Sequence, residues 1–113
     1  MPDGSVIVCE TMTQKMEMMR GMMFRDQLPP EVCVQFPQTG ALPSVGFGLA
    51  GALTRRASTL QPNTPVGELQ WGGLAGTHWA ISPATGHALV LMTQRYMGFW
   101  NPYWFEWKAA VYA

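Results

Sequence analysis

The stretch GELQWGGLAGTHWAISPATGHALVLMT, residues 67–93, decides the fold. Three segments in it, Glu68–Gly72, Gly76–Ser82 and His87–Thr93, have the length and apolar content of strands, and glycine-rich turns separate them. Such short joins favour antiparallel pairing of consecutive strands. The run Ala88–Met92 is apolar at every position. It predicts a central strand that is covered on both faces.

The segments on either side extend this pattern. Val45–Thr54 is predicted as a further strand, with large residues on one face and small ones on the other, which indicates that another element packs close to the small face. Tyr103–Tyr112 is predicted as a closing helix, because Asn101 and Pro102 suit a cap and a first helical position. Near the start, Glu10–Phe24 is predicted as a core-facing helix with four methionines at helical spacing: Met12, Met16, Met19 and Met23.

These elements predict a single α+β domain over residues 1–113. We expect an antiparallel sheet of about four strands, flanked by an N-terminal and a C-terminal helix. The segment Glu31–Ser44 is expected to be an irregular connection with extended pieces. A chain of 113 residues suits one small domain and is too short for two.

The charge content of the chain is low. Seven Lys+Arg and seven Asp+Glu give a formal net charge of zero, and charged residues make up 12% of a chain where about 25% is usual. A neutral surface excludes nucleic-acid binding by counterion release. A small domain with so little charge often covers part of its surface against a partner. We therefore expect a homo-oligomer, or association with a missing N-terminal part of the domain.

Residues with metal or redox chemistry are few. Cys9 and Cys33 are too few for a disulfide framework or a metal site and are expected as small buried hydrophobes. His78 and His87 lie on different predicted strands without a carboxylate or cysteine at metal spacing, so neither a metal nor a cofactor is expected. The glycines at 72, 73 and 76 lack the Lys-Ser/Thr of a phosphate loop.

No membrane span is expected. Two stretches without charge, Val32–Thr54 and Leu69–Gln94, are interrupted by prolines, glutamines, histidines and turn-like glycines. A secretory signal is not visible at the start of the sequence. We therefore expect a cytoplasmic location, although an N-terminal truncation would remove a signal too.

Several segments resemble a known family. Residues 67–83 resemble the third-motif hairpin of the serine β-lactamase superfamily, in particular the class C enzymes and their esterase and penicillin-binding-protein-like relatives. Val45–Leu49 is similar to the glycine-rich strand before that hairpin, and Leu89–Gln94 to the strand after it. Phe99–Phe105 resembles the entry to the terminal helix, and Asp26–Pro29 the segment after an earlier helix. The resemblance covers most of this chain but only the last part of the family's domain, so it implies a partial β-lactamase-like fold.

The resemblance implies a site. In the family a serine attacks an acyl carbonyl, assisted by a lysine three residues later and a tyrosine of a Tyr-x-Asn motif, and the third motif closes the site. Trp71 would take the first position of that motif, and Gly72 and Gly73 would let substrate approach the strand. The backbone N–H of Leu74 would donate to the oxyanion of the tetrahedral intermediate.

Two departures limit what the resemblance implies. Trp71 stands where a β-lactamase usually has lysine, which is more like the esterase branch. The chain has no Tyr-x-Asn and no Ser-x-x-Lys after any of its serines, which are Ser5, Ser44, Ser58 and Ser82. We therefore expect a truncated relative or fragment of a serine hydrolase of acyl esters or amides, not catalytic alone. The alternative is a small self-associating module that binds a peptide, a small apolar ligand or another subunit.

Overall fold

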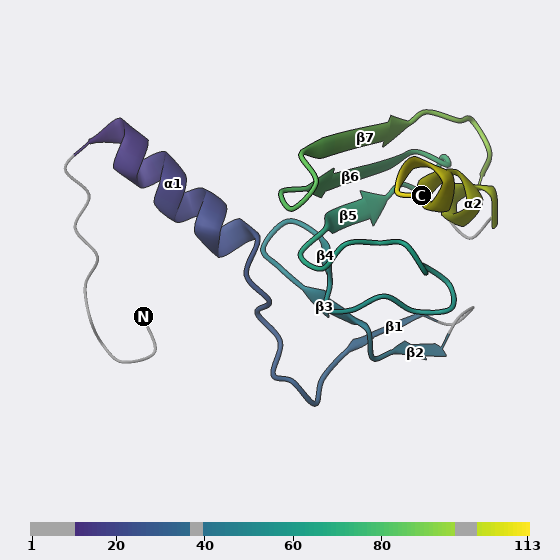
Figure 1. The fold of residues 1–113 in the computed structure, drawn as a ribbon, viewed down its shortest axis with the longest axis horizontal. Helices are drawn as coiled ribbons and strands as arrows, with labels where there is room; N and C mark the ends of the chain where they lie inside the picture. The colour runs from purple at the N-terminus through teal and green to yellow at the C-terminus, as the bar shows by residue number, and fades with distance from the viewer. Residues whose placement is uncertain (1–10, 37–39, 97–101) are drawn as a thin grey trace.

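The computed structural model describes residues 11–36, 40–96 and 102–113. They form two helices and two antiparallel sheets, which confirms the α+β prediction with a helix at each end (Figure 1). The helices are α1 (Met12–Met23) and α2 (Pro102–Val111). The strands are β1 (Val34–Phe36), β2 (Gly40–Leu42), β3 (Val45–Phe47), β4 (Ala52–Thr54), β5 (Leu69–Gly72), β6 (His78–Ser82) and β7 (His87–Leu91). β1 pairs with β2, and the other five form one sheet in the order β3-β4-β5-β6-β7.

The predicted strand Val45–Thr54 is in fact a hairpin. The chain turns between β3 and β4, where the Gly48 N–H donates to the Gly51 carbonyl at 2.8 Å and Phe47 pairs with Ala52. The small residues of this stretch make the turn, so the sheet has five strands instead of about four. Gly51 packs closely against β5, since a Cβ there would lie 2.7 Å from the Gln70 carbonyl oxygen. The expected irregular connection before this hairpin likewise contains the β1–β2 pair.

The prediction of β7 as a central strand is wrong. β7 pairs with β6 along one edge, and no strand among the described residues pairs with its other edge. Leu89 is buried beneath α2, whereas Val90 on the opposite face is 64% exposed. An unbroken apolar run is compatible with burial of both faces of a strand, but it does not predict that other elements cover both faces.

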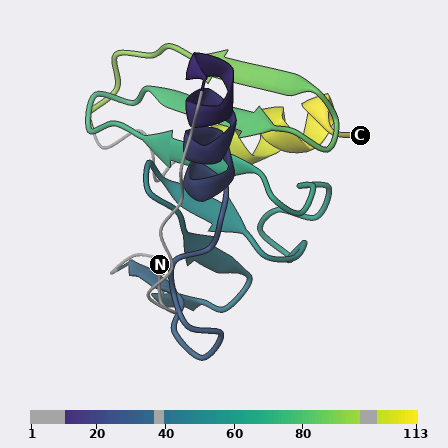
Figure 2. The same cartoon turned by 90° about the vertical axis from the view of Figure 1, so that its left-hand side faces the viewer.

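The core lies between α2 and the sheet, which Figure 2 shows side by side. Ala80, Leu89 and Trp104 form its buried centre. The partly buried residues around it are Leu91, Phe105, Trp107, Val111 and Tyr112. The predicted closing helix is thus confirmed, while its expected cap, Asn101, lies outside the described residues. Of the two cysteines, Cys9 also lies outside them, and Cys33 is only partly buried.

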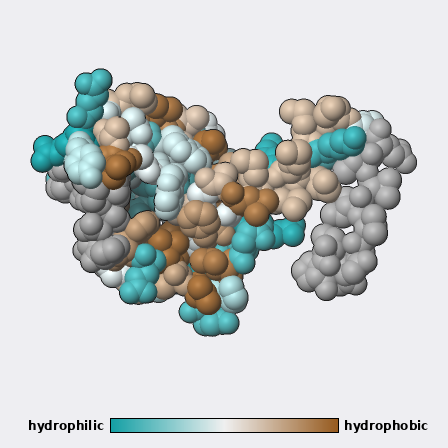
Figure 3. Space-filling view, turned by 180° about the vertical axis from the view of Figure 1, so that it is seen from behind, coloured by the Kyte–Doolittle hydropathy of each residue, from teal (hydrophilic) through white to brown (hydrophobic). Residues whose placement is uncertain are grey.

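Helix α1 forms as predicted but does not face a core. Thr11 and Gln14 make a reciprocal capping box at its start. None of its residues is buried, and Met12, Met16 and Met19 are 70%, 64% and 59% exposed. The helix stands away from the rest of the chain in Figures 1 and 3. The methionine spacing identifies the face that favours burial, but within this chain nothing described covers that face.

The segment after α1 is held to the sheet by Asp26. Its carboxylate accepts hydrogen bonds from the Phe47 N–H at 3.2 Å, the Leu28 N–H at 3.0 Å and Arg55 Nε at 2.6 Å. A Cβ on Gly46 would collide with that carboxylate, so glycine is required there. Partial burial works to raise the pKa of Asp26, but the bonds from Arg55, Leu28 and Phe47 outweigh it and hold the pKa below the usual 3.8.

The first prediction concerns this carboxylate. Because its pKa is lower in the folded state, Asp26 stabilises the fold fully above pH about 4, and this contribution is lost as the pH falls through the folded pKa. We expect Asp26→Asn to lower the unfolding free energy at neutral pH and to flatten its decline in acid. Urea unfolding followed by tryptophan fluorescence, from pH 7 to pH 2.5, measures both. Parallel pH curves for the two proteins would contradict the assignment.

Candidate functional site

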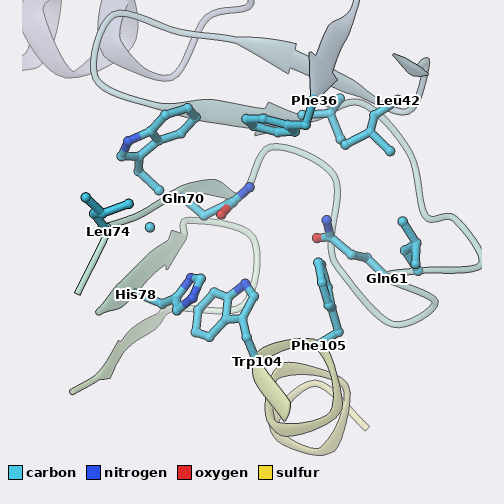
Figure 4. A pocket seen from close by; sticks show the side chains of 12 residues that line it. Phe36, Leu42, Gln61, Gln70, Leu74, His78, Trp104 and Phe105 are labelled. Carbon is cyan, nitrogen blue, oxygen red and sulfur yellow. The ribbon is translucent and has the colours of Figure 1, made fainter. Parts of the chain in front are cut away.

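An open cavity of about 320 Å³ lies between the β1–β2 hairpin, β5 and α2 (Figure 4). Its volume is at the lower end of the range of ligand sites, about 300–1,000 Å³. The lining contains no Asp, Glu, Lys or Arg among the described residues and is mostly aromatic and aliphatic. It consists of Phe36, Leu42, Val45, Leu60, Gln61, Gln70, Trp71, Gly72, Leu74, His78, Trp104 and Phe105.

Three of the four sequence-predicted site residues line this cavity: Trp71, Gly72 and Leu74. They come together because β5 ends at Gly72 and the chain turns at the cavity's edge. The Trp71 ring packs edge-on against Phe47, with centroids 5.4 Å apart, and is tilted against Phe36 at 6.1 Å. These contacts hold the indole in place while 37% of the residue remains exposed.

Gly73, the fourth predicted residue, does not line the cavity. Its N–H donates to the Thr77 carbonyl at 2.7 Å, and a Cβ there would lie 2.5 Å from Thr77 Oγ1. The turn is closed by Gly76, whose φ of +89° suits glycine. Within the described residues the Leu74 N–H has no hydrogen-bond partner, and its side chain is 54% exposed. The turn thus leaves the Leu74 N–H available as a donor beside the cavity.

The two histidines lie in different environments. His78 is buried and stacks on Trp104, with ring centroids 4.2 Å apart and an interplanar angle of 15°, so it forms part of the cavity wall. His87 contacts Thr85, with Nδ1 2.8 Å from Oγ1, and lies edge-on to Tyr112. Among the described residues no group of His, Cys, Asp and Glu could hold a metal ion.

A buried ion pair lies behind the cavity wall, and sequence reasoning missed it. Lys108 Nζ lies 2.7 Å from Glu68 Oε1, and both side chains are almost completely buried. The ammonium also donates to Gln61 Oε1 at 2.6 Å and lies 5.4 Å from the Trp104 ring centroid. The sequence did contain a sign that Lys108 is buried, because Lys108 follows Trp104 by one helical turn and therefore lies on the same face of the helix. A lone lysine on a short helix is usually exposed, and nothing local predicts the contact with Glu68.

Burial also changes the ionisation of this cluster. It lowers the pKa of Lys108, although the Glu68 carboxylate acts in the opposite direction. Burial and the neighbouring Glu68 carboxylate together raise the pKa of Tyr112. The Tyr112 phenol is therefore neutral at neutral pH.

Comparison with known proteins agrees in part with the family resemblance. No protein-family model matches the chain. Over 72 residues, or 63% of the chain, the sequence is 33% identical to Esterase EstB from Burkholderia gladioli. The match spans only 18% of that esterase's length. The chain is therefore similar to a part of an esterase, which supports a relationship with hydrolases. Neither described helix is long and apolar enough to cross a membrane.

The second prediction tests the ion pair. Lys108→Met removes the cation and leaves the Glu68 carboxylate buried and uncompensated, so we expect a loss of about 3–5 kcal/mol in unfolding free energy. The double change Lys108→Met with Glu68→Gln removes both charges and should recover much of that loss. Urea unfolding measures all three proteins, with Lys15→Met on the exposed face of α1 as the control. Equal effects of Lys108→Met and Lys15→Met would show that the pair has no such role.

Proposed function

We propose that this chain is the substrate-binding portion of a β-lactamase-like serine hydrolase, which binds small acyl compounds but does not hydrolyse them alone. One observation carries the proposal: Trp71, Gly72 and Leu74 line an uncharged apolar cavity in a chain similar to an esterase. Its 113 residues contain neither Ser-x-x-Lys nor Tyr-x-Asn. The nucleophile and its base would have to come from another part of the protein or a separate chain.

The cavity favours neutral acyl groups. Moving a carboxylate into an apolar site without a cationic partner is strongly unfavourable, and no lysine or arginine of the described residues lines this cavity. Trp71 instead offers an aromatic surface for an acyl or aryl group. The backbone N–H of Leu74 is the proposed oxyanion donor, because it lies in the turn at the cavity's edge and lacks a described partner. Gly72 would allow the ligand to approach the end of β5.

The third prediction tests this site with p-nitrophenyl butyrate. We expect the purified chain to bind the ester, as measured by equilibrium dialysis, without releasing p-nitrophenol. Trp71→Ala should weaken binding by about tenfold, because it removes a large aromatic contact. Leu49→Ala is the control, since Leu49 is 58% exposed and lies outside the cavity lining.

Two results would contradict the proposal. Equal affinities of wild type, Trp71→Ala and Leu49→Ala would place ester binding elsewhere. Release of p-nitrophenol that survives purification and is lost in Trp71→Ala would show that the chain is an enzyme by itself.

A second candidate function is a small self-associating binding module, and the free edge of β7 favours it. Residues 69–94 contain no Asp, Glu, Lys or Arg, although edge strands are commonly protected from association by charges, prolines or bulges. The outer face beside that edge is apolar, because Ile81, Val90 and Met92 are 40%, 64% and 73% exposed. Pairing of β7 with its copy would cover both the free edge and part of that face.

The fourth prediction concerns this association. We expect light scattering to show a mass that rises with concentration, and Val90→Lys to shift the protein toward monomer by placing a charge beside the edge. Leu49→Lys, on the β3–β4 turn, controls for the added charge itself. A monomer at every concentration would exclude the self-associating module and leave the cavity as the site to test.

A further inference from the structure

Gln61 is a cavity residue whose backbone and side-chain amide are both held by hydrogen bonds. It lies in the loop between β4 and β5, and its N–H donates to the Ser58 carbonyl at 3.2 Å and to Ser58 Oγ at 3.3 Å. The Ser58 N–H donates back to the Gln61 carbonyl at 3.3 Å. These backbone hydrogen bonds hold the main chain of Gln61 in place independently of its side chain. In Figure 4 the amides of Gln61 and Gln70 project toward the cavity from different segments.

Lys108 determines which way the Gln61 amide faces. An ammonium group only donates hydrogen bonds, so the Gln61 atom 2.6 Å from Lys108 Nζ has to be the amide oxygen. Thr64 Oγ1 donates to the same oxygen at 3.4 Å. With its oxygen directed at Lys108, the amide presents its nitrogen on the opposite side. Among the described residues no group accepts a hydrogen bond from that Nε2.

The ammonium itself cannot turn to another partner. Glu68 holds it at 2.7 Å, and both charged groups are buried, so separating them would leave two uncompensated charges. A second contact joins the loop to α2, because Asn63 Nδ2 donates to the Ala109 carbonyl at 3.0 Å. The positive charge also polarises the amide that accepts from it, which strengthens the amide as a donor.

We propose that Gln61 determines the cavity's specificity: its Nε2–H donates to an uncharged oxygen acceptor of the ligand, and Lys108 is the residue that positions it. The ligand class is an apolar neutral molecule with a carbonyl or ether oxygen, such as an ester or a ketone. This inference rests on the proposed function of the cavity and adds the group that recognises the ligand's polar atom. Lys108 acts only through Gln61, because it does not line the cavity.

Two probes of nearly equal shape test the proposal. Butyrophenone and butylbenzene differ in a carbonyl against a methylene, and equilibrium dialysis gives their affinities for the same protein. The quantity of interest is the ratio of the ketone's affinity to the hydrocarbon's, since the two probes differ in their own hydrophobicity. We expect Gln61→Met to lower this ratio by about tenfold, the effect of about one hydrogen bond. Gln35→Met on the exposed side of β1 is the matched control and should leave the ratio unchanged.

Two further variants distinguish recognition from mere packing. Gln61→Glu keeps the side chain's shape and its bond to Lys108 but can only accept, so preference should move from butyrophenone to 1-phenyl-1-butanol. Lys108→Met with Glu68→Gln removes both buried charges and frees the Gln61 amide to rotate. In that variant the ratio should fall by about threefold or more, while butylbenzene binding changes little. Urea unfolding confirms that each variant is folded.

The outcomes separate the two proposals. If both probes bind and Gln61→Met leaves the ratio unchanged, the assignment of Gln61 is wrong and the cavity remains a binding site. If Gln61→Glu keeps the preference for the ketone, the assignment is also wrong. If neither probe binds the wild-type chain, the proposed function of the cavity fails, and this inference fails with it.

Discussion

The buried ion pair between Lys108 and Glu68 is the constraint on which the rest of the structure depends. It joins α2 to the residue immediately before β5, 40 positions away in the sequence. Burying two charges is unfavourable unless they lie close together and their remaining hydrogen-bonding groups also find partners. Here the ammonium also donates to Gln61 and lies over the Trp104 ring. Helix, sheet and loop therefore meet at a single charged group, and a shift in any of them would disturb the others.

The same constraint shapes the cavity. The Lys108–Glu68 pair lies behind the cavity wall, so the described lining is mostly aromatic and aliphatic. Its polar side chains are the amides of Gln61 and Gln70 and the imidazole of His78. Trp104 connects the two environments, since one side of it contacts Lys108 and it also stacks on His78. A site of this kind favours neutral ligands through the apolar contacts. Its specificity then comes from a small number of oriented donors.

Local patterns were sufficient to predict much of this fold. Both helices, the antiparallel strands of residues 67–93 and the position of Trp71 beside a turn follow from spacing and from glycine placement. The resemblance to the β-lactamase superfamily directed attention to Trp71, Gly72 and Leu74, which do line one cavity.

What the sequence could not predict depends on long-range contacts. Three features were not predicted: the turn between β3 and β4, the free edge of β7 and the exposure of Met16. Each depends on which other segments pack against it, and the local sequence does not contain that information. Gln61 is a still clearer case, because nothing in the local sequence indicates how the amide of a glutamine in a polar loop is oriented. Only the distance to Lys108, 47 positions along the chain, gives its amide a direction.

The measurement that tests this account most directly is the side-chain amide NMR spectrum of Gln61 in ¹⁵N-labelled protein, with its signals identified by their loss in Gln61→Met. If the amide held by Lys108 donates to the ligand, saturating butyrophenone should move the Gln61 Nε2–H signals downfield, whereas butylbenzene should not. The signals of the exposed Gln35 should stay in place with both probes. Identical Gln61 spectra with the two probes bound would contradict the account.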